Sequence, residues 1–270
     1  MIRFIRAISL LMLFISNLYA QQGHYSLGAR SRGMANASIT LFDGFAAYNN
    51  PAGLSKTKGH ALFFSCKNHY GLNGLFTIGA GYNSRIFSGV GSLNFFRFGD
   101  HLLNEHKIGL GFSHKIRFIS LGLQFNYIQL NMEGYGRRRW LAIEFGGIVE
   151  ISKNIIVASH IFNLSNSLFR KGFSDLPVII KAGISYRPVE PLMFNIEYEH
   201  TLDQFSLIKI GMEYALKGTV FLRSGVVVDN HKPTFGIGFK PRKFYINYSL
   251  EIHPILGCSQ ELSVSYKPSK

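Results

Sequence analysis

The sequence carries little charge for its length, only two cysteines and a single tryptophan. Charged residues make up 16% of the 270 positions, and 15 acidic residues stand against 29 lysines and arginines. Beyond Ala20 no stretch is apolar for long enough to form a transmembrane helix, which needs about 20 residues. A mature chain that enters a membrane must therefore do so as a β-barrel.

Signatures of enzymes and metal sites are also absent from the sequence. There is no His/Cys cluster with zinc spacing, no G-x-S-x-G motif and no P-loop, and the histidines are dispersed. The lysines and arginines behind the net charge of +14 are scattered, whereas nucleic-acid binding usually gathers them into one helix or stripe. Basic loops and turns beside the headgroups of outer-membrane lipid explain the charge more simply. We therefore expect a protein that is not an enzyme, with no catalytic residue, cofactor, metal or nucleic-acid partner.

The N-terminal segment has the pattern of an export signal. Met1–Arg6 contains two arginines, the run Ala7–Ile15 is apolar, and the sequence SNLYA ends in a small residue before Gln21. This pattern predicts a cleaved signal peptide over residues 1–20. We expect the exported protein to reach the outer membrane of a bacterial cell.

From His60 onward, hydrophobicity alternates with a period of two residues. In FNIEYEH, for example, Phe194, Ile196 and Tyr198 alternate with polar residues. An apolar, often aromatic face opposite a face of Gly, Ser or charged residues is typical of strands with lipid outside and a polar lumen inside. Fourteen such strands are expected, at 60–68, 73–82, 85–96, 106–114, 117–130, 139–151, 154–163, 177–187, 192–200, 205–215, 218–227, 232–240, 243–250 and 258–266.

The connections between these segments alternate in length. Every second connection is short, as at 83–84, 115–116 and 216–217, whereas the others are mostly longer. Short periplasmic turns that alternate with longer outer loops are typical of outer-membrane barrels. The sequence thus predicts an all-β fold, a transmembrane antiparallel β-barrel of about 14 strands over residues 60–270. A soluble β-protein, which has no need of this alternation, is the alternative.

Charges of alternating sign fall on the inward faces of four neighbouring strands. Hairpin geometry would place Lys181 opposite Glu197 and would set Glu197 near Lys209. The following hairpin would bring Glu213 close to Arg223. Opposite charges on adjacent strands stabilise their pairing modestly. These residues form either a structural charge ladder or a polar path through the lumen.

The two cysteines allow two interpretations. Cys66 lies near the end of the first expected strand and Cys258 begins the last, and these strands pair when a barrel closes. Both positions would face outward near the outer rim, and an exported protein meets an oxidising compartment. Either a disulfide joins Cys66 to Cys258 across the closing seam, or both are unpaired residues that face lipid.

Two shorter segments have structural interpretations. The sequence GRRRW at 136–140 lies at the end of a longer connection, and we interpret it as a loop that contacts phosphates or sugars of the outer lipid. Trp140 would then belong to an interfacial aromatic belt. The glycine-rich sequence at 79–91 lies in strands, where we expect glycine to let packed strands approach closely.

Residues 21–59 do not follow the two-residue period of the strands. Small residues alternate with spaced bulky ones, and the breaker-rich sequence GFAAYNNPAGLSK stands at 44–56. With both ends of the barrel in the periplasm, this segment starts beneath a lumen that is too wide for the wall's own side chains to fill. We therefore expect residues 21–59 to fold inside the barrel as a plug. The Asn-Pro-Gly turn would direct the chain into the first strand and act as a gate.

Two motifs in this segment resemble the N-terminal signature of the FadL-like outer-membrane β-barrel superfamily, and they look most like its PorV/PorQ family. The motifs are LGARSRGMANASIT and FAAYNNPAGLS. The matching residues are Gly28, Ala29, Arg30, Gly33, Met34, Asn50, Pro51, Ala52, Gly53 and Leu54. The sequence departs from the family at Asn36, where glycine is usual. The resemblance implies a plugged barrel of fourteen strands, and beyond the motifs it is architectural only.

The resemblance implies one of two functions. PorV/PorQ-type proteins are non-enzymatic accessory components of type IX secretion and surface attachment, with secretion-machinery proteins as partners. FadL-type members are passive transporters of hydrophobic compounds across the outer membrane, with a plug that gates the path and a lateral opening in the wall. Short outer loops and the lack of a marked apolar lumen favour the secretion role. Transport of a hydrophobic small molecule is the alternative, and a structural barrel that contacts peptidoglycan or partner proteins is a third candidate.

Overall fold

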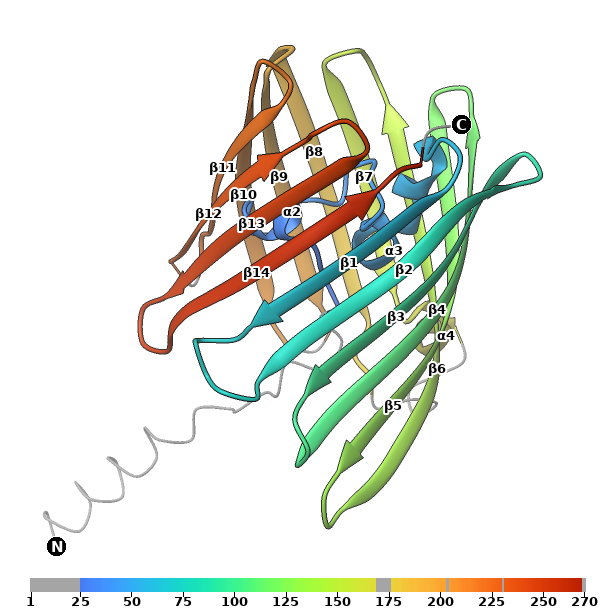
Figure 1. The fold of residues 1–270 in the computed structure, drawn as a ribbon. Coiled ribbons are helices and arrows are strands. Elements are labelled where there is room, and N and C mark those ends of the chain that lie inside the picture. The colour runs from blue at the N-terminus through green and yellow to red at the C-terminus, as the bar shows by residue number, and fades with distance from the viewer. Residues whose placement is uncertain (1–24, 169–175, 203, 230, 269–270) are drawn as a thin grey trace, which may run out of the picture.

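A computed structural model describes residues 25–168, 176–202, 204–229 and 231–268. The predicted signal peptide at 1–20 lies outside the described residues. Within them, the chain forms a closed β-barrel that encloses its own N-terminal segment (Figure 1).

Fourteen antiparallel strands make the barrel, and each pairs with its neighbours in the sequence. The last strand closes on the first, with a continuous register from Leu62–Tyr266 to Asn68–Gln260. The strands are β1 Ala61–Asn68, β2 Phe76–Ile86, β3 Gly89–Gly99, β4 Leu103–Ile116, β5 Ile119–Met132, β6 Gly136–Glu150, β7 Ile155–Phe162, β8 Ile179–Val189, β9 Leu192–Thr201, β10 Ser206–Leu216, β11 Val220–Val227, β12 Lys232–Phe239, β13 Phe244–His253 and β14 Gly257–Tyr266. The predicted fold class is confirmed.

Side-chain alternation explains why these segments form a barrel wall. In β5, Leu121, Leu123 and Phe125 are exposed on the outer face, while Gln124 and Asn126 are buried toward the lumen. Every strand carries at least one large exposed apolar side chain on its outer face. This outer surface suits contact with hydrocarbon, and the polar inner surface suits a lumen.

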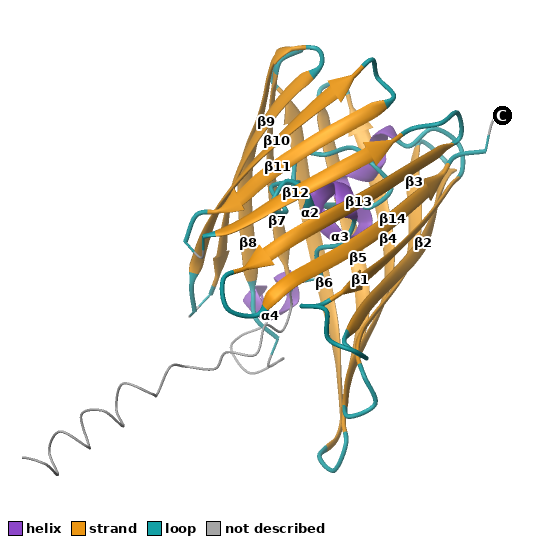
Figure 2. Cartoon of the chain, turned by 60° about the vertical axis from the view of Figure 1, so that its left-hand side comes forward, coloured by secondary structure: helices purple, strands orange, loops and turns teal. Residues whose placement is uncertain are grey.

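The two ends of the barrel differ in their connections. At the end where β1 starts and β14 finishes, which we call the short-turn end, tight turns join the strands (Figure 1). Four of these turns place a non-glycine residue at positive φ, as tight hairpin turns often require. These residues are Phe87, Arg117, Lys217 and Arg242. At the opposite, long-loop end, the hairpin of β5 and β6 projects beyond its neighbours (Figure 2).

Strand boundaries differ from the predicted ones mainly at the first hairpin. The turn expected at 83–84 lies within β2, because β2 and β3 continue to pair as far as Ile86 and Gly89. The chain therefore turns at Phe87 instead. Strand pairing decides where a hairpin ends, and the polar residues Asn83 and Ser84 did not mark a turn.

Residues 25–57 lie inside the barrel, and we call them the plug (Figures 1 and 2). The plug contains the short helices α2 (Ala29–Arg32) and α3 (Ala46–Asn49) and the 3-10 helix η1 (Pro51–Lys56). A further short helix, α4 (Leu164–Leu168), lies beside β6 at the long-loop end. Among the described residues, no helix is long and apolar enough to cross a membrane.

The hydrophobic core lies between the plug and one side of the wall. The plug residues of the main cluster are Tyr25, Leu27, Phe45, Ala46, Ala47, Tyr48 and Leu54. Its wall members are Phe63, Val90, Phe96, Ile128, Ala142, Phe162 and Ile179, which lie on β1, β3 and β5–β8. The plug meets β9–β14 mainly through polar and charged groups, so its two sides are held by different interactions.

Candidate functional site

The first plug motif is held against the closing seam of the barrel. The Gly28 amide donates to Glu261 Oε1 on β14 at 2.6 Å, and the Ala29 amide donates to Ser263 Oγ at 3.1 Å. Glu261 Oε1 also accepts from Ser65 Oγ on β1 at 2.8 Å, so one carboxylate joins the plug to both strands of the seam. Gly28 has a φ of +110°, and an added Cβ would lie 2.9 Å from an aromatic carbon of the plug. Glycine is the residue that tolerates this position.

The rest of this motif packs on wall positions that lack a side chain. Gly33 abuts Gly236 so closely that a Cβ added to either would lie 3.0 Å from the Cα of the other. Met34 is fully buried over Gly211 and Gly225, where an added Cβ would come within 2.6 Å of its atoms. Glycine on the inner wall thus makes room for the plug backbone.

Asn36, where the sequence departs from the resembled family, has a φ of +59°. Asparagine tolerates this left-handed conformation better than most residues with a side chain. Its neighbour Ala35 is also left-handed, and the Ala35 amide donates to Thr234 Oγ1 on β12 at 2.9 Å. The substitution of asparagine for glycine is therefore compatible with the backbone turn at this position.

Arg30 of the first motif attaches the plug to the wall through two hydrogen bonds to one carboxylate. Its Nε and Nη2 donate to the two carboxylate oxygens of Glu213 at 2.9 and 2.6 Å, and its Nη1 lies 3.2 Å from Asp43 Oδ2. On the wall, Arg223 Nε donates to the same Glu213 at 2.6 Å. A planar guanidinium matches a carboxylate through two parallel hydrogen bonds, which fixes the orientation of both groups.

The predicted ladder residues all lie on the inner wall, with one change of partner. Lys181 pairs with Glu199 at 3.0 Å and not, as predicted, with Glu197. Val189 still pairs with Leu192, so the hairpin turns at 190–191, and its register sets Gly183 opposite Glu197. Lys209 lies 3.2 Å from Glu197 Oε1 and 2.6 Å from Glu199 Oε2. The ladder therefore joins β8, β9 and β10 into one ionic cluster.

Carboxylates of the ladder also bind the plug. Glu197 Oε2 accepts hydrogen bonds from the amides of Ser38 and Ile39 at 2.9 and 3.0 Å. Glu213 is shared between the plug and the wall, as described for Arg30. These carboxylates are thus engaged by the plug and do not line an open passage.

The second plug motif packs on the wall of β4, β5 and β6. The Asn50 side chain accepts from the Ala52 amide at 3.1 Å and donates to the Ile39 carbonyl at 2.8 Å, which caps η1. Gly146 and Gly122 face this turn from the wall. A Cβ added to them would lie 1.9 Å from Asn50 Oδ1 and 2.3 Å from the Ala52 amide nitrogen, respectively.

The remaining residues of this motif shape the turn itself. Pro51 begins η1, where its fixed φ suits the first helical position. Gly53 leaves no room for a side chain, because an added Cβ would lie 2.2 Å from the Leu41 carbonyl oxygen. Leu54 is fully buried in the plug–wall core. The motif therefore fixes a compact turn against the wall just before the chain enters β1.

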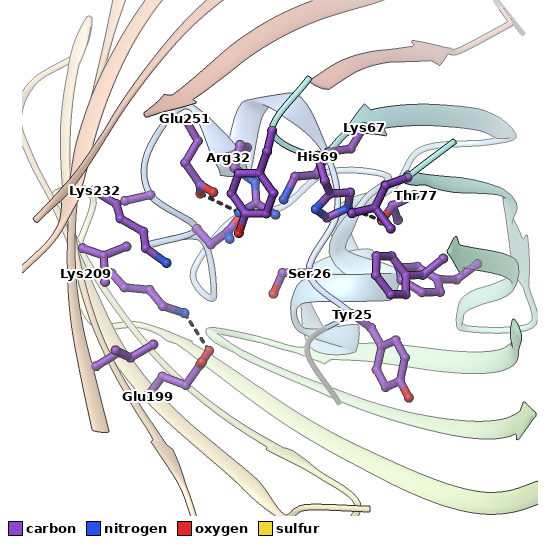
Figure 3. A pocket seen from close by; sticks show the side chains of 18 of the residues that line it. Tyr25, Ser26, Arg32, Lys67, His69, Thr77, Glu199, Lys209, Lys232 and Glu251 are labelled. Atoms are coloured by element: carbon purple, nitrogen blue, oxygen red, sulfur yellow. Dashed lines mark hydrogen bonds and ion pairs between the residues drawn. The ribbon is translucent and has the colours of Figure 1, made fainter. Parts of the chain in front are cut away.

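Between the plug and the long-loop end lies a cavity of about 240 Å³, which we call the chamber (Figure 3). Plug residues form one side of it. The lining residues are Tyr25, Ser26, Arg32, Ala35, Asn36, Lys67, His69, Tyr70, Leu75, Thr77, Phe96, Phe98, Glu105, Glu199, Leu207, Lys209, Val227, Lys232 and Glu251. The chamber is thus charged on part of its surface and aromatic or aliphatic on the rest.

Cations outnumber carboxylates around the chamber. Arg32 Nη1 donates to Glu251 Oε2 at 2.8 Å, which attaches the plug to β13. Lys67 and Lys232 also point toward this space (Figure 3). Neither lysine forms an ion pair with any residue that the structure describes. Four basic side chains therefore line the chamber beside three carboxylates.

Two titratable groups of the chamber are uncharged at neutral pH. Burial and two nearby cations lower the pKa of His69 to about 3, so its ring is neutral and shares a hydrogen bond of 2.7 Å with Thr77 Oγ1. Burial raises the pKa of Tyr25, and the adjacent Glu105 raises it further. The Tyr25 hydroxyl therefore keeps its proton and donates a hydrogen bond to Glu105 Oε1.

Aromatic rings connect the chamber with a groove on the outside of the barrel. Phe96 lines the chamber, its ring centroid lies 6.3 Å from that of Tyr48, and Tyr48 lies 5.9 Å from Phe63. Phe63 also lines an apolar outer groove of about 710 Å³ over β14 and β1–β4. A Cβ added to Gly81 would lie 2.2 Å from the Phe63 ring. The wall is therefore thin at Gly81.

The outer groove lies over a wall that is fully hydrogen-bonded. Its other lining residues are Leu62, Phe64, Ala80, Tyr82, Leu93, Asn94, Phe95, Ile108, Val264 and Tyr266. β2 pairs without interruption with β1 on one side and with β3 on the other. The lateral opening that the FadL-type resemblance implies is therefore closed at these strands.

Both cysteines are free in the structure, so the disulfide between Cys66 and Cys258, one of the two interpretations of the sequence, is not formed. The seam register pairs Cys66 with Leu262, whereas Cys258 pairs with Ile252 on β13 and lies beyond the end of the seam. A disulfide requires the two Cβ atoms to lie about 4 Å apart. The alternative interpretation, two unpaired cysteines with outward parity, fits this register.

Two further interpretations of the sequence are wrong. Trp140 faces the lumen, because it pairs with the fully buried Ile128 and packs against the plug–wall core. The segment GRRRW is strand and not loop, since β6 begins at Gly136. In β2, Gly79 makes room for the plug, because an added Cβ would lie 2.1 Å from Leu27 Cδ2.

Sequence reasoning missed the carboxylates that hold the plug at the seam. Glu251 pairs with Arg32, and Glu261 accepts from the Gly28 amide. The available signal was an acidic residue that follows an inward serine along the strand, as Glu251 follows Ser249 and Glu261 follows Ser259. The plug arginines of the first motif were the obvious partners.

No protein-family model matches this sequence, and no curated protein matches it. Several solved structures are similar to the whole chain. The CymD monoaromatic hydrocarbon channel has a TM-score of 0.67 at 11% identity, over 92% of this chain and 99% of that chain. The toluene transporter TbuX of Ralstonia pickettii has a TM-score of 0.69 at 11% identity, over 90% and 97%. The toluene transporter TodX of P. putida has a TM-score of 0.68 at 12% identity, over 90% and 98%.

These neighbours share the barrel fold that the resemblance of the plug motifs implies, and none of them bears on the PorV/PorQ family. Identities of 11% and 12% support a common fold and do not transfer a substrate. The chain has the barrel fold of these hydrocarbon channels and transporters.

Proposed function

We propose that the protein lies in the bacterial outer membrane and lets small hydrophobic molecules cross it passively, without catalysis. The observation behind this proposal is the row of rings Phe96, Tyr48 and Phe63, which runs from the chamber to the thin wall at Gly81. An apolar molecule in the chamber would meet aromatic surface at each step toward the outer groove. The likeness in fold to CymD, TbuX and TodX supports this role.

The plug would separate this path from water and ions. It fills the lumen through apolar contacts on one side and ion pairs on the other. Passage of an apolar molecule would then require movement of the Phe63 ring and its neighbours and not release of the whole plug. The outer groove would deliver the molecule to the hydrocarbon layer, which favours apolar solutes over water.

Uptake of labelled toluene by a deletion strain tests this proposal. Loss of the protein should slow uptake, and the native chain should restore it. Ala80→Trp should fill the outer groove and fail to restore uptake, because Ala80 is a small residue on its floor. Ala182→Trp is the matched control, since Ala182 is exposed on the outer face of β8, away from the groove. Equal uptake with and without the protein would refute the channel role.

An accessory role in type IX secretion or surface attachment is the second candidate. It is supported by the segments Gly28–Met34 and Asn50–Leu54, whose pattern looks most like the PorV/PorQ family. Secretion-machinery proteins would then be the partners. The same deletion strain separates the two roles: loss of surface-attached cargo with normal toluene uptake would favour secretion and overturn the channel.

A further inference from the structure

The hairpins from β3 to β6 carry a polar, basic row on the outside of the barrel that the channel does not use. The register places Arg97 beside His106, His106 beside Gln129, and Gln129 beside Arg139. Arg97, His106 and Gln129 alternate with lumen-facing neighbours that are mostly buried, and Arg139 has the outward parity of Leu141 on β6, so all four point outward. The segment GRRRW therefore contributes to an extended surface and not to an isolated loop.

A hydrogen-bonded network of uncharged groups occupies the centre of this face. The Tyr127 hydroxyl donates to Gln129 Oε1 at 3.2 Å, and Gln129 Nε2 donates to Asn131 Oδ1 at 3.1 Å. Asn131 Nδ2 donates to Asn104 Oδ1 at 2.7 Å, and His106 Nε2 lies 3.1 Å from the same oxygen. These bonds hold the polar side chains in a fixed arrangement across β4 and β5.

Arginines border this network. Arg97, Arg137 and Arg139 are exposed, and none of them forms an ion pair with a residue that the structure describes. A hollow of about 410 Å³, lined in part by Asn131 and Arg137, lies over the network. Glu133 is the carboxylate among its lining residues. The face therefore offers unpaired positive charge beside a preformed polar hollow.

The next outward row toward the short-turn end is apolar. The register aligns Phe95, Ile108, Tyr127 and Leu141, whose exposed fractions are 40%, 48%, 39% and 65%. Two residues along a strand span about 7 Å, so the surface changes from apolar to cationic over that distance. A lipid layer has the same profile where its acyl chains give way to headgroups.

We propose that this face binds a phosphorylated lipid of the outer leaflet, with acyl chains along the apolar row and phosphate groups against Arg97, Arg137 and Arg139. A guanidinium matches phosphate geometry through paired hydrogen bonds. At the same end of β1 and β14, the outward residues Asn68 and Gln260 carry no charge, so the site is confined to one side of the barrel. This inference rests on the proposed membrane location and is independent of transport.

Binding of diphosphoryl lipid A to the purified protein in detergent tests the inference. The same lipid without its phosphates and inorganic phosphate alone are the comparison ligands. Each arginine near a lipid surface contributes about fivefold to binding, so the triple variant Arg97→Gln, Arg137→Gln and Arg139→Gln should bind on the order of a hundredfold more weakly. High salt should weaken binding to the native chain.

Arg138→Gln is the matched control, because Arg138 lies on the same strand with the opposite parity and pairs with the buried Leu130. It should bind the lipid as the native chain does. Equal weakening by Arg138→Gln, unchanged binding by the triple variant, or equal binding of the dephosphorylated lipid would overturn the inference. Equally strong binding of inorganic phosphate alone would show that the arginines bind a free anion and not a lipid, and would also overturn the inference. Heat-modifiable gel migration verifies folding, and recovery of the folded native chain in the soluble periplasm would instead refute the membrane location.

Discussion

Gly146 on β6 is the wall position where one added methyl group should disturb the plug most. The Cβ of an alanine would lie 1.9 Å from Asn50 Oδ1 and 3.3 Å from Pro51 Cδ. Asn50 has little freedom to retreat, because its side chain binds the Ala52 amide at 3.1 Å and the Ile39 carbonyl at 2.8 Å. Gly146→Ala must therefore displace this side chain and break at least one of the two hydrogen bonds.

The expected cost follows from these contacts. Overpacking by a methyl group costs about 1–3 kcal/mol, and a buried amide without its partner costs about 1–3 kcal/mol more. The attachment of the plug should therefore weaken by about 2–6 kcal/mol, a factor of at least about thirty in the equilibrium between docked and released plug. The backbone pairing of β6 is unchanged, so the barrel itself should remain assembled.

Ion conductance in planar bilayers measures release of the plug. Gly147→Ala is the matched control, since its Cβ would meet Ser159 Oγ at 3.6 Å and Leu121 Cδ2 at 3.9 Å, both ordinary contacts. Gly146→Ala should raise conductance and expose residues 25–57 to protease, while Gly147→Ala should do neither. Both variants should keep heat-modifiable migration. If the two variants conduct alike, packing of the Asn-Pro-Gly turn on β6 does not hold the plug, and the predicted gate is refuted.

Three further predictions test the attachment of the plug and the direction of single side chains. Arg30→Gln should weaken the attachment of the plug by about 1–3 kcal/mol, measured as protease sensitivity of residues 25–57. The double variant with Glu213→Gln should lose less attachment energy than the two single variants summed, and additive losses would show that the two residues are not coupled. Alkylation without reductant followed by mass spectrometry should label both Cys66 and Cys258, and a bonded pair would contradict the seam register. Lipids brominated in their acyl chains should quench Trp140 fluorescence little, whereas strong quenching would place the ring on the outer face.

The wall of the barrel was largely predictable from the sequence, because alternation and short turns together fix both parity and register. The pairs of Lys209 with Glu197 and of Glu213 with Arg223 follow from such hairpins. Lys181 was assigned the wrong carboxylate because a pair of Lys181 with Glu197 requires a turn centred on Val189, whereas Val189 still pairs with Leu192 and the chain turns at 190–191. Hairpin register is thus readable only where the sequence marks the exact position of the turn.

Features that depend on strand length or on the plug were harder to predict. Three successive arginines hide the alternation at the start of β6, so Trp140 was assigned to the wrong face. Inward glycines such as Gly122 and Gly146 resemble ordinary strand glycines in the sequence, and only the docked turn shows that they make room for its backbone. The plug motifs could be located, but their partners on the wall follow from tertiary packing.

The position of Glu261 has a consequence for assembly. This carboxylate receives Gly28 from the plug and Ser65 from β1, yet it lies on β14. Because export begins at the N-terminus, Gly28 arrives before β14, the strand that carries its hydrogen-bond partner Glu261. Capture of the plug and closure of the barrel therefore share one residue. An intermediate that still lacks β14 would lack this anchor for its plug, and it would also lack the hydrogen bond from Ser65 that Glu261 accepts across the seam.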